Sequence, residues 1–223
     1  MTSGEGSEAW VEAAELNNRG LALAREGRFG EAIGAYRRAV EVSRGAGHRK
    51  ALATALDNLS ATVAWTGRIG EGIAAHEEAL AIFQDLGDVD GQSVALSNLA
   101  AIHTRAGRPQ AAVAAQRQAI EVARAAGERK AEAMALSHLG QILAADGNET
   151  GAVQAHRDTV AICRELGDRE AVARETQTLA ARLAEAGQFT AARETAEGAA
   201  AIFRDIGRHA DAATLKQWLE YLP

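Results

Sequence analysis

Glycine recurs along this chain at a fixed interval of forty residues, in two interleaved series. One series contains Gly27, Gly67, Gly107, Gly147 and Gly187, and the second, offset by twenty residues, contains Gly47, Gly87, Gly127, Gly167 and Gly207. An interval kept over most of the 223 residues indicates one structural unit copied five times. Because such a chain grows by stacking its units, we do not expect a single central core.

Each copy contains two helical segments that end at these glycines. In the first segment apolar residues recur at i, i+3 and i+7, as in Leu56, Leu59 and Val63, which predicts a helix with one buried stripe. A small residue within the stripe lets the second helix approach closely, and it occupies one position in all copies: Gly20, Ser60, Ala100, Gly140 and Ala180. Glycine just past a helix end predicts a left-handed C-terminal cap, and Asp88 and Asp168 are predicted N-caps. The strong helix formers Ala, Leu, Glu and Arg are abundant, so the chain is predicted to be all-α.

The pattern of both helices resembles the tetratricopeptide repeat (TPR). It is most complete in the first copy, in Gly20, Leu23, Gly27, Phe29, Ala32, Tyr36 and Ala39. The family's usual period is about 34 residues, and the forty-residue version resembles the kinesin-light-chain and LGN-like subgroup and the repeats of bacterial regulators. The resemblance implies a right-handed α-α superhelical solenoid of TPR hairpins.

The repeat sets the expected domain boundaries. Residues 1–8 are expected to form a flexible N-terminal tail, with Ser7 capping the first helix. Five repeats are expected at about 9–47, 48–87, 88–127, 128–167 and 168–207, followed by a C-terminal capping helix at 208–223. Ala212, Leu215, Leu219 and Leu222 form the apolar stripe of that last helix, beside Trp218.

Charge and composition disfavour several classes of partner. The net charge is −6 and the basic residues are dispersed, so nucleic acid is not an expected partner. No apolar run approaches the ~20 residues of a membrane span, and Met1 to Trp10 does not form a secretory signal. The expected compartment is the cytoplasm, and the dominance of arginine over lysine suggests a bacterial, GC-rich source.

The family resemblance places the first helices along an inner, concave groove. Asn18, Asn58 and Asn98 repeat at one position there, and a carboxamide can donate to and accept from an extended peptide backbone. The alternative is that each Asn bonds its neighbouring helix and orients the stack. The expected peptide-binding set adds an apolar anchor, two helix-end arginines and two polar residues of the fourth repeat: Trp65, Arg25, Arg105, His138 and Gln141.

Two of these expectations have competing explanations. Trp65 is expected to form a shallow apolar pocket with Ala61, Ala64 and Ala101, or else to pack on the loop near Gly67 and Arg68. The arginines either bind acidic ligand side chains or complement helix dipoles. We expect no cofactor, metal or catalytic site: His103 and His138 lack a third ligand, and Cys163 has the position of a buried hydrophobe.

The predicted function is a non-catalytic scaffold that binds an extended peptide or a short helix of a protein partner in the concave groove. One alternative is a peptide-sensing or partner-holding module of a bacterial signalling or transcription regulator. Another is a homo-oligomeric structural protein, whose dimer would form through Trp218, Tyr221 and Leu222 of the C-terminal helix.

Overall fold

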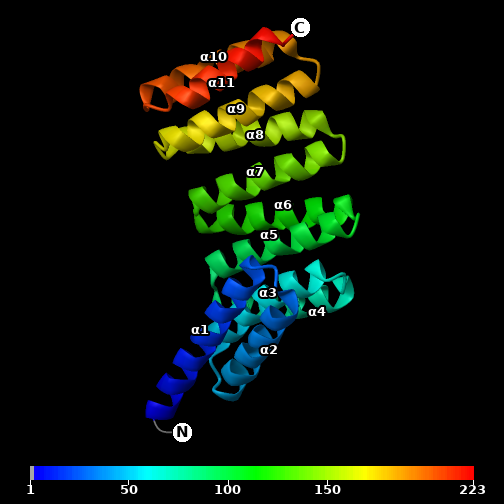
Figure 1. The fold of residues 1–223 in the computed structure, drawn as a ribbon, viewed down its shortest axis with the longest axis vertical. Coiled ribbons are helices and arrows are strands. Elements are labelled where there is room, and N and C mark those ends of the chain that lie inside the picture. Colours follow the sequence, from blue (N-terminus) through cyan, green and yellow to red (C-terminus); the bar gives the residue numbers. More distant parts are fainter. Residues whose placement is uncertain (1–2) are drawn as a thin grey trace. The chain divides into compact units, whose positions relative to one another are not determined.

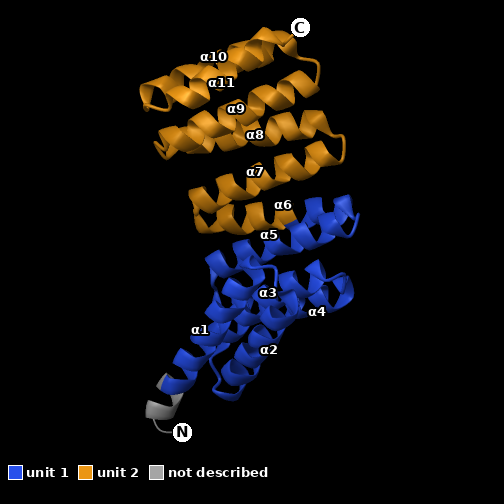
Figure 2. Cartoon of the chain, viewed as in Figure 1, with its two compact units in different colours: residues 1–115 blue, residues 116–223 orange. Residues whose placement is uncertain are grey.

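The structure is a computed structural model that describes the backbone of residues 3–223 and the side chains of residues 8–223. Within this range the chain forms eleven helices and no strand, and it divides into two units, residues 1–115 and 116–223 (Figures 1 and 2). Unit 1 contains α1 (Ser3–Arg25), α2 (Phe29–Gly45), α3 (Arg49–Trp65), α4 (Ile69–Leu86) and α5 (Val89–Arg105). The boundary lies within α6 (Pro109–Ala126), and unit 2 continues with α7 (Arg129–Ala145), α8 (Glu149–Glu165), α9 (Arg169–Glu185), α10 (Phe189–Asp205) and α11 (His209–Glu220).

The predicted hairpins are present in both units. Consecutive helices pack against each other from α1 to α5 and from α7 to α11. In unit 1 the first helices of successive repeats, α1, α3 and α5, also contact one another and so form a layer of their own. Helix α1 begins at Ser3, so Ser7 lies within this helix; Met1 and Thr2, from the predicted tail, lie outside the described residues.

The glycine series end the helices as predicted. All ten glycines have positive φ, between 64° and 89°. At Gly27 the amide donates to the Ala24 carbonyl at 3.1 Å, and the following Arg28 amide donates to the Leu23 carbonyl at 2.9 Å, which satisfies the last carbonyls of α1. Both predicted N-caps are confirmed, because Asp88 accepts from the Gly91 amide and Asp168 from the Ala171 amide.

In two hairpins the small residue of the first helix packs against a ring from the second helix. The Tyr36 ring, 1 % exposed, lies so close to Gly20 that a Cβ there would stand 2.5 Å from the ring. Gly140 faces the fully buried His156 in the same way, at 2.6 Å. His76 and His156, which occupy the position of Tyr36 in their own repeats, are thus core residues. Cys163 is also buried, and burial raises the pKa of its thiol.

Charged residues follow the same forty-residue register on the outside. Arg49 at the start of α3 pairs with Asp85 at the end of α4, at 2.7 Å, and Arg169 pairs with Asp205 at 3.0 Å in the same way in α9 and α10. Arg129 and Glu165 form the equivalent pair between α7 and α8. Because these groups are largely solvated, the pairs contribute little to stability, and they mark the register of the repeats.

Candidate functional site

Most of the predicted binding residues lie at exposed or half-buried positions of the first helices α1, α3 and α5 in unit 1. We call the surface that they form the first-helix face, and it contains Asn18, Arg25, Asn58, Trp65, Asn98 and Arg105. Asn18 and Arg25 are exposed on α1, whereas Asn58 on α3 and Asn98 on α5 are half-buried. Trp65, at the end of α3, is 57 % exposed. His138 and Gln141 are exposed on α7, which belongs to unit 2.

The asparagines bond between neighbouring first helices. The Asn58 Nδ2 donates to the Asn17 Oδ1 at 2.9 Å, and the Asn98 Nδ2 donates to the Asp57 Oδ2 at 2.7 Å. In both cases the acceptor is on the first helix of the preceding repeat, directly before the asparagine of that repeat: Asn17 precedes Asn18, and Asp57 precedes Asn58. This geometry is that of the alternative in which the asparagines orient the stack. Within the described residues no hydrogen bond engages the two Oδ1 atoms, so each amide keeps an acceptor for a ligand.

Asp57 connects this row to the core of the repeat, and sequence reasoning missed it. Its side chain is almost fully buried, and its Oδ1 lies 3.2 Å from the Nδ1 of the buried His76. The carboxylate thus accepts a hydrogen bond from the amide of α5, which holds the Asn98 side chain, while its other oxygen lies beside the imidazole of α4. The signal for it was the recurrence of polar residues at one forty-residue position on an otherwise apolar side: Asn17, Asp57, Ser97 and Ser137.

Unit 2 contains a second buried histidine–carboxylate pair. The Nδ1 of His156 lies 3.1 Å from the Glu175 Oε2, and the Ser137 hydroxyl donates to the Glu175 Oε1 at 3.0 Å. Burial alone would raise the pKa of Glu175, but the hydrogen bonds from His156 and Ser137, together with nearby positive charge, hold it below its usual value. The pair joins α7, α8 and α9 and is part of the core packing.

Trp65 contacts an aromatic ring and a guanidinium from two neighbouring helices. The Phe29 ring, from the start of α2, lies parallel to the indole, with 6.4 Å between ring centroids and 11° between planes. From the end of α5, the Arg105 guanidinium lies 4.2 Å from the centroid of the Trp65 ring and donates to the Trp65 carbonyl oxygen at 3.2 Å. The arginine thus complements the C-terminal end of α3, and the alanine wall around the indole stays a prediction.

The remaining candidates have simpler environments. Arg25 occupies the Trp65 position one repeat earlier and, among the described residues, forms no ion pair within 4.0 Å. Burial lowers the pKa of the half-buried His103, as do the charges of Arg108 and His76, which favours its neutral imidazole. His103 and His138 belong to different units, and no group of three or more metal-ligating side chains exists within the described residues.

Two of the three residues predicted to form a dimer contact, Trp218 and Leu222, pack against other helices of the same chain. Trp218 packs against the apolar clusters of α8 to α10, and Leu222 packs against one of them. The Arg193 guanidinium donates to the carbonyl oxygens of Leu219 and Leu222 at 3.2 and 3.1 Å, which fastens the end of α11. Tyr221 alone of the three is fully open, at 86 % exposed. No described helix combines the length and apolarity that crossing a lipid bilayer requires.

Comparisons with solved structures identify the fold. A kinesin-light-chain TPR-like repeat protein of Podosopora anserina superposes with a TM-score of 0.72 at 17 % identity, covering 93 % of this chain and 100 % of that one. The apo form of RapI gives 0.76 at 15 % identity over 93 % of this chain and 58 % of its own. A STAND signal-transduction ATPase with a TPR sensor, from Pyrococcus horikoshii, gives 0.71 at 16 % identity; 90 % of this chain is covered, but only 31 % of the ATPase.

Sequence comparisons agree with the fold. A search of curated proteins found no match. Family models described as tetratricopeptide repeat match residues 13–46, 52–125 and 133–166, which together make up more than half of the chain. The forty-residue interval, the left-handed glycines, the paired helices and these matches agree, and the chain belongs to the tetratricopeptide repeat family.

Proposed function

We propose that this chain is a non-catalytic, cytoplasmic protein-interaction module that binds an extended peptide or a short helix on the first-helix face of unit 1. The observation that supports this most is Trp65, which is held in place by contacts with Phe29 and Arg105 while more than half of it stays exposed. A fixed, exposed aromatic loses little conformational freedom on binding and is typical of an interface anchor.

The chemistry of the face suggests what the ligand offers. The Oδ1 atoms of Asn58 and Asn98 can accept from peptide N–H groups without disturbing the bonds that hold the asparagines. Arg25 supplies an exposed guanidinium at the same end of the face as Trp65 and suits an acidic ligand side chain. We therefore propose a ligand with an apolar residue for Trp65 and an acidic residue for Arg25. His138 and Gln141 are proposed as contacts for a ligand of unit 2.

The test compares two variants that break the same hydrogen bond. Asn17→Ala removes the acceptor of the Asn58 amide, and Asn58→Ala removes the donor together with the proposed ligand-facing oxygen. Both should lower the free energy of unfolding by about 1 kcal/mol. Peptides selected from a displayed library on the wild-type chain should bind Asn17→Ala nearly as well as wild type, but bind Asn58→Ala and Trp65→Ala about tenfold more weakly.

Trp10→Ala serves as the control for the tryptophan, because Trp10 is 55 % exposed on α1 and is not part of the stacked Phe29–Trp65 pair. Equal affinity of the selected peptides for the wild-type, Asn58→Ala and Trp65→Ala chains would refute the proposed site. If Asn17→Ala and Asn58→Ala weaken binding equally, the asparagines act by orienting the helices alone.

A second candidate function is the sensor or partner-holding part of a signalling protein. It is supported by the superposition on the TPR sensor of the STAND ATPase and on RapI. Sedimentation with and without a selected peptide separates this candidate from a homo-oligomeric structural protein, since a sensor or scaffold binds the peptide as a monomer. A dimer that Tyr221→Ala dissociates would instead favour the structural protein.

A further inference from the structure

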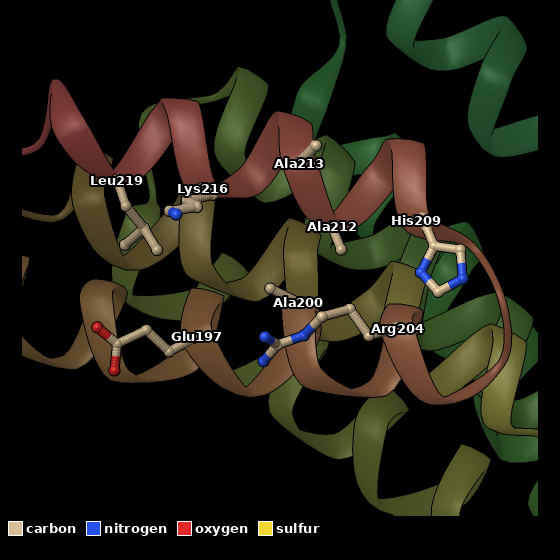
Figure 3. Close-up of a pocket in the computed structure, with 8 residues that line it drawn as sticks. All are labelled: Glu197, Ala200, Arg204, His209, Ala212, Ala213, Lys216 and Leu219. Atoms are coloured by element: carbon tan, nitrogen blue, oxygen red, sulfur yellow. The ribbon is translucent and has the colours of Figure 1, made fainter.

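Unit 2 contains an open groove between α10 and α11, with a cavity volume of about 440 Å³ (Figure 3). Ala200 from α10 and Ala212, Ala213 and Leu219 from α11 supply its apolar surface. The two helices are antiparallel, and Glu197 lies at the end where α11 finishes, opposite Arg204 and His209 (Figure 3). Lys216 lies at the same end as Glu197, so the groove has a basic end at Arg204 and His209 and an end of mixed charge at Glu197 and Lys216.

The preceding repeat shows how a groove of this kind is used. The equivalent surface between α8 and α9 is formed by residues forty positions earlier, among them Val160 for Ala200, Arg164 for Arg204 and Leu179 for Leu219. There the cavity is bordered on its third side by Thr195, Gly198 and Ile202 of α10. The second helix of the next repeat therefore lies along this surface, and the groove between α10 and α11 has the shape to receive a helix along the same path.

Burial shows that this surface of α11 is uncovered. The position of Ala213 is buried in every earlier repeat, where the second helix covers it: Ala13, Ala53, Ser93, Ala133 and Ala173. Ala213 itself is exposed. Lys216 is exposed as well, whereas Leu56, Leu96 and Leu136 at its position are buried. The surface thus keeps apolar contacts for a helix, at Ala213 and Leu219, but Lys216 adds a positive charge. A surface that is only partly apolar suits a partner that binds reversibly.

Ion pairs in unit 1 indicate the charges that the incoming helix should present. Arg37 of α2 pairs with Glu71 of α4 at 2.8 Å, and Arg44 pairs with Glu78 at 2.5 Å. In α10 the positions of Arg37 and Arg44 hold Glu197 and Arg204. A helix on the same path should therefore have a basic residue opposite Glu197 and, seven positions later, an acidic residue opposite Arg204. In this orientation, parallel to α10, the positive end of its dipole also lies toward Glu197.

We propose that the groove between α10 and α11 is a second binding site, which takes an amphipathic helix from a partner protein. The bound helix runs parallel to α10, packs a stripe of small and apolar residues on Ala200, Ala213 and Leu219, and forms ion pairs with Glu197 and Arg204. This site is separate from the proposed peptide face, because it lies between α10 and α11 of unit 2 and selects a helix by an apolar stripe and two charges.

The test uses two synthetic helices and one charge exchange. The first helix has the sequence of residues 189–205 with Ala191→Lys and Gly198→Glu, which are the positions of Glu71 and Glu78. The second carries Ala191→Glu and Gly198→Lys. Both are held helical by a staple on the outer side and labelled for fluorescence anisotropy. The wild-type chain should bind the first about tenfold more tightly, because two attractive charge pairs replace two repulsive ones.

The variant with Glu197→Arg and Arg204→Glu should reverse this preference, and both substituted positions are exposed, so the core is untouched. Ala213→Trp should fill the groove and weaken binding of the first helix at least tenfold, with an unchanged circular dichroism spectrum. Failure of the first helix to bind, or a preference that the charge exchange leaves unaltered, would overturn the proposal. So would a wild-type dimer in sedimentation that Ala213→Trp dissociates, since the occupant would then be a second copy of the chain.

Discussion

Gly20→Ala should destabilise the protein even though alanine is the better helix former. Replacing a glycine in a helix interior gains about 1 kcal/mol from helix propensity. At Gly20, however, the new Cβ would stand 2.5, 2.7 and 2.8 Å from three atoms of the Tyr36 ring, which is rigid and buried. Overpacking of this kind costs about 1–3 kcal/mol. Because the ring is buried and all three distances are far below van der Waals contact, we expect the clash to prevail, with a net loss of up to about 2 kcal/mol.

Gly34→Ala is the matched control within the same hairpin. Gly34 lies in the middle of α2 and is exposed, and no neighbouring side chain or helix comes within 4 Å of the place that a Cβ would occupy. Its substitution should therefore stabilise the chain by about 0.5–1 kcal/mol. Urea denaturation followed by circular dichroism at 222 nm measures both changes, which should have opposite signs.

A double-mutant cycle tests whether the ring is responsible. At the equivalent positions of the fifth repeat, Ala180 and Ala196 are both buried, so a Cβ is compatible with a small residue at the Tyr36 position. In a Tyr36→Ala background, Gly20→Ala should therefore become stabilising, by about 1 kcal/mol. The reasoning would be refuted if Gly20→Ala stabilised the wild-type chain as Gly34→Ala does, or if its effect were the same in both backgrounds.

Two further predictions concern single side chains of unit 2. Asp168→Ala removes the acceptor for the Ala171 amide at 2.9 Å and should cost about 1 kcal/mol of stability, measured by urea denaturation, whereas Asp168→Asn should retain most of it because asparagine is also a good N-cap. Glu175 has a folded-state pKa below its ordinary value of 4.5, so its ionised form stabilises the fold above that pH, and this contribution is lost as the pH falls through the folded-state pKa. Thermal melts below about pH 4.5 should show a smaller acid destabilisation in Glu175→Gln than in wild type, and equal pH dependence of the two chains would contradict this role.

Features that depend on neighbours in the sequence could be predicted from the sequence alone. The left-handed glycines and the caps at Asp88 and Asp168 require only backbone geometry within one turn, and all were predicted correctly. The repeat of forty residues likewise determined the number and order of the helix pairs. The sequence showed Gly20 as a small residue within a buried apolar stripe. It did not show that the Tyr36 ring packs against this glycine.

Contacts between residues forty positions apart were decided by the tertiary structure. The partners of Asn58, Asn98 and Trp65 belong to neighbouring helices, and their identity depends on the offset and distance at which the first helices pack. A periodic pattern gives the side of a helix on which a residue lies, but not the atom that it meets there. The same holds for the groove between α10 and α11, since exposure of Ala213 follows from the absence of a covering helix among the described residues and not from its own residue type.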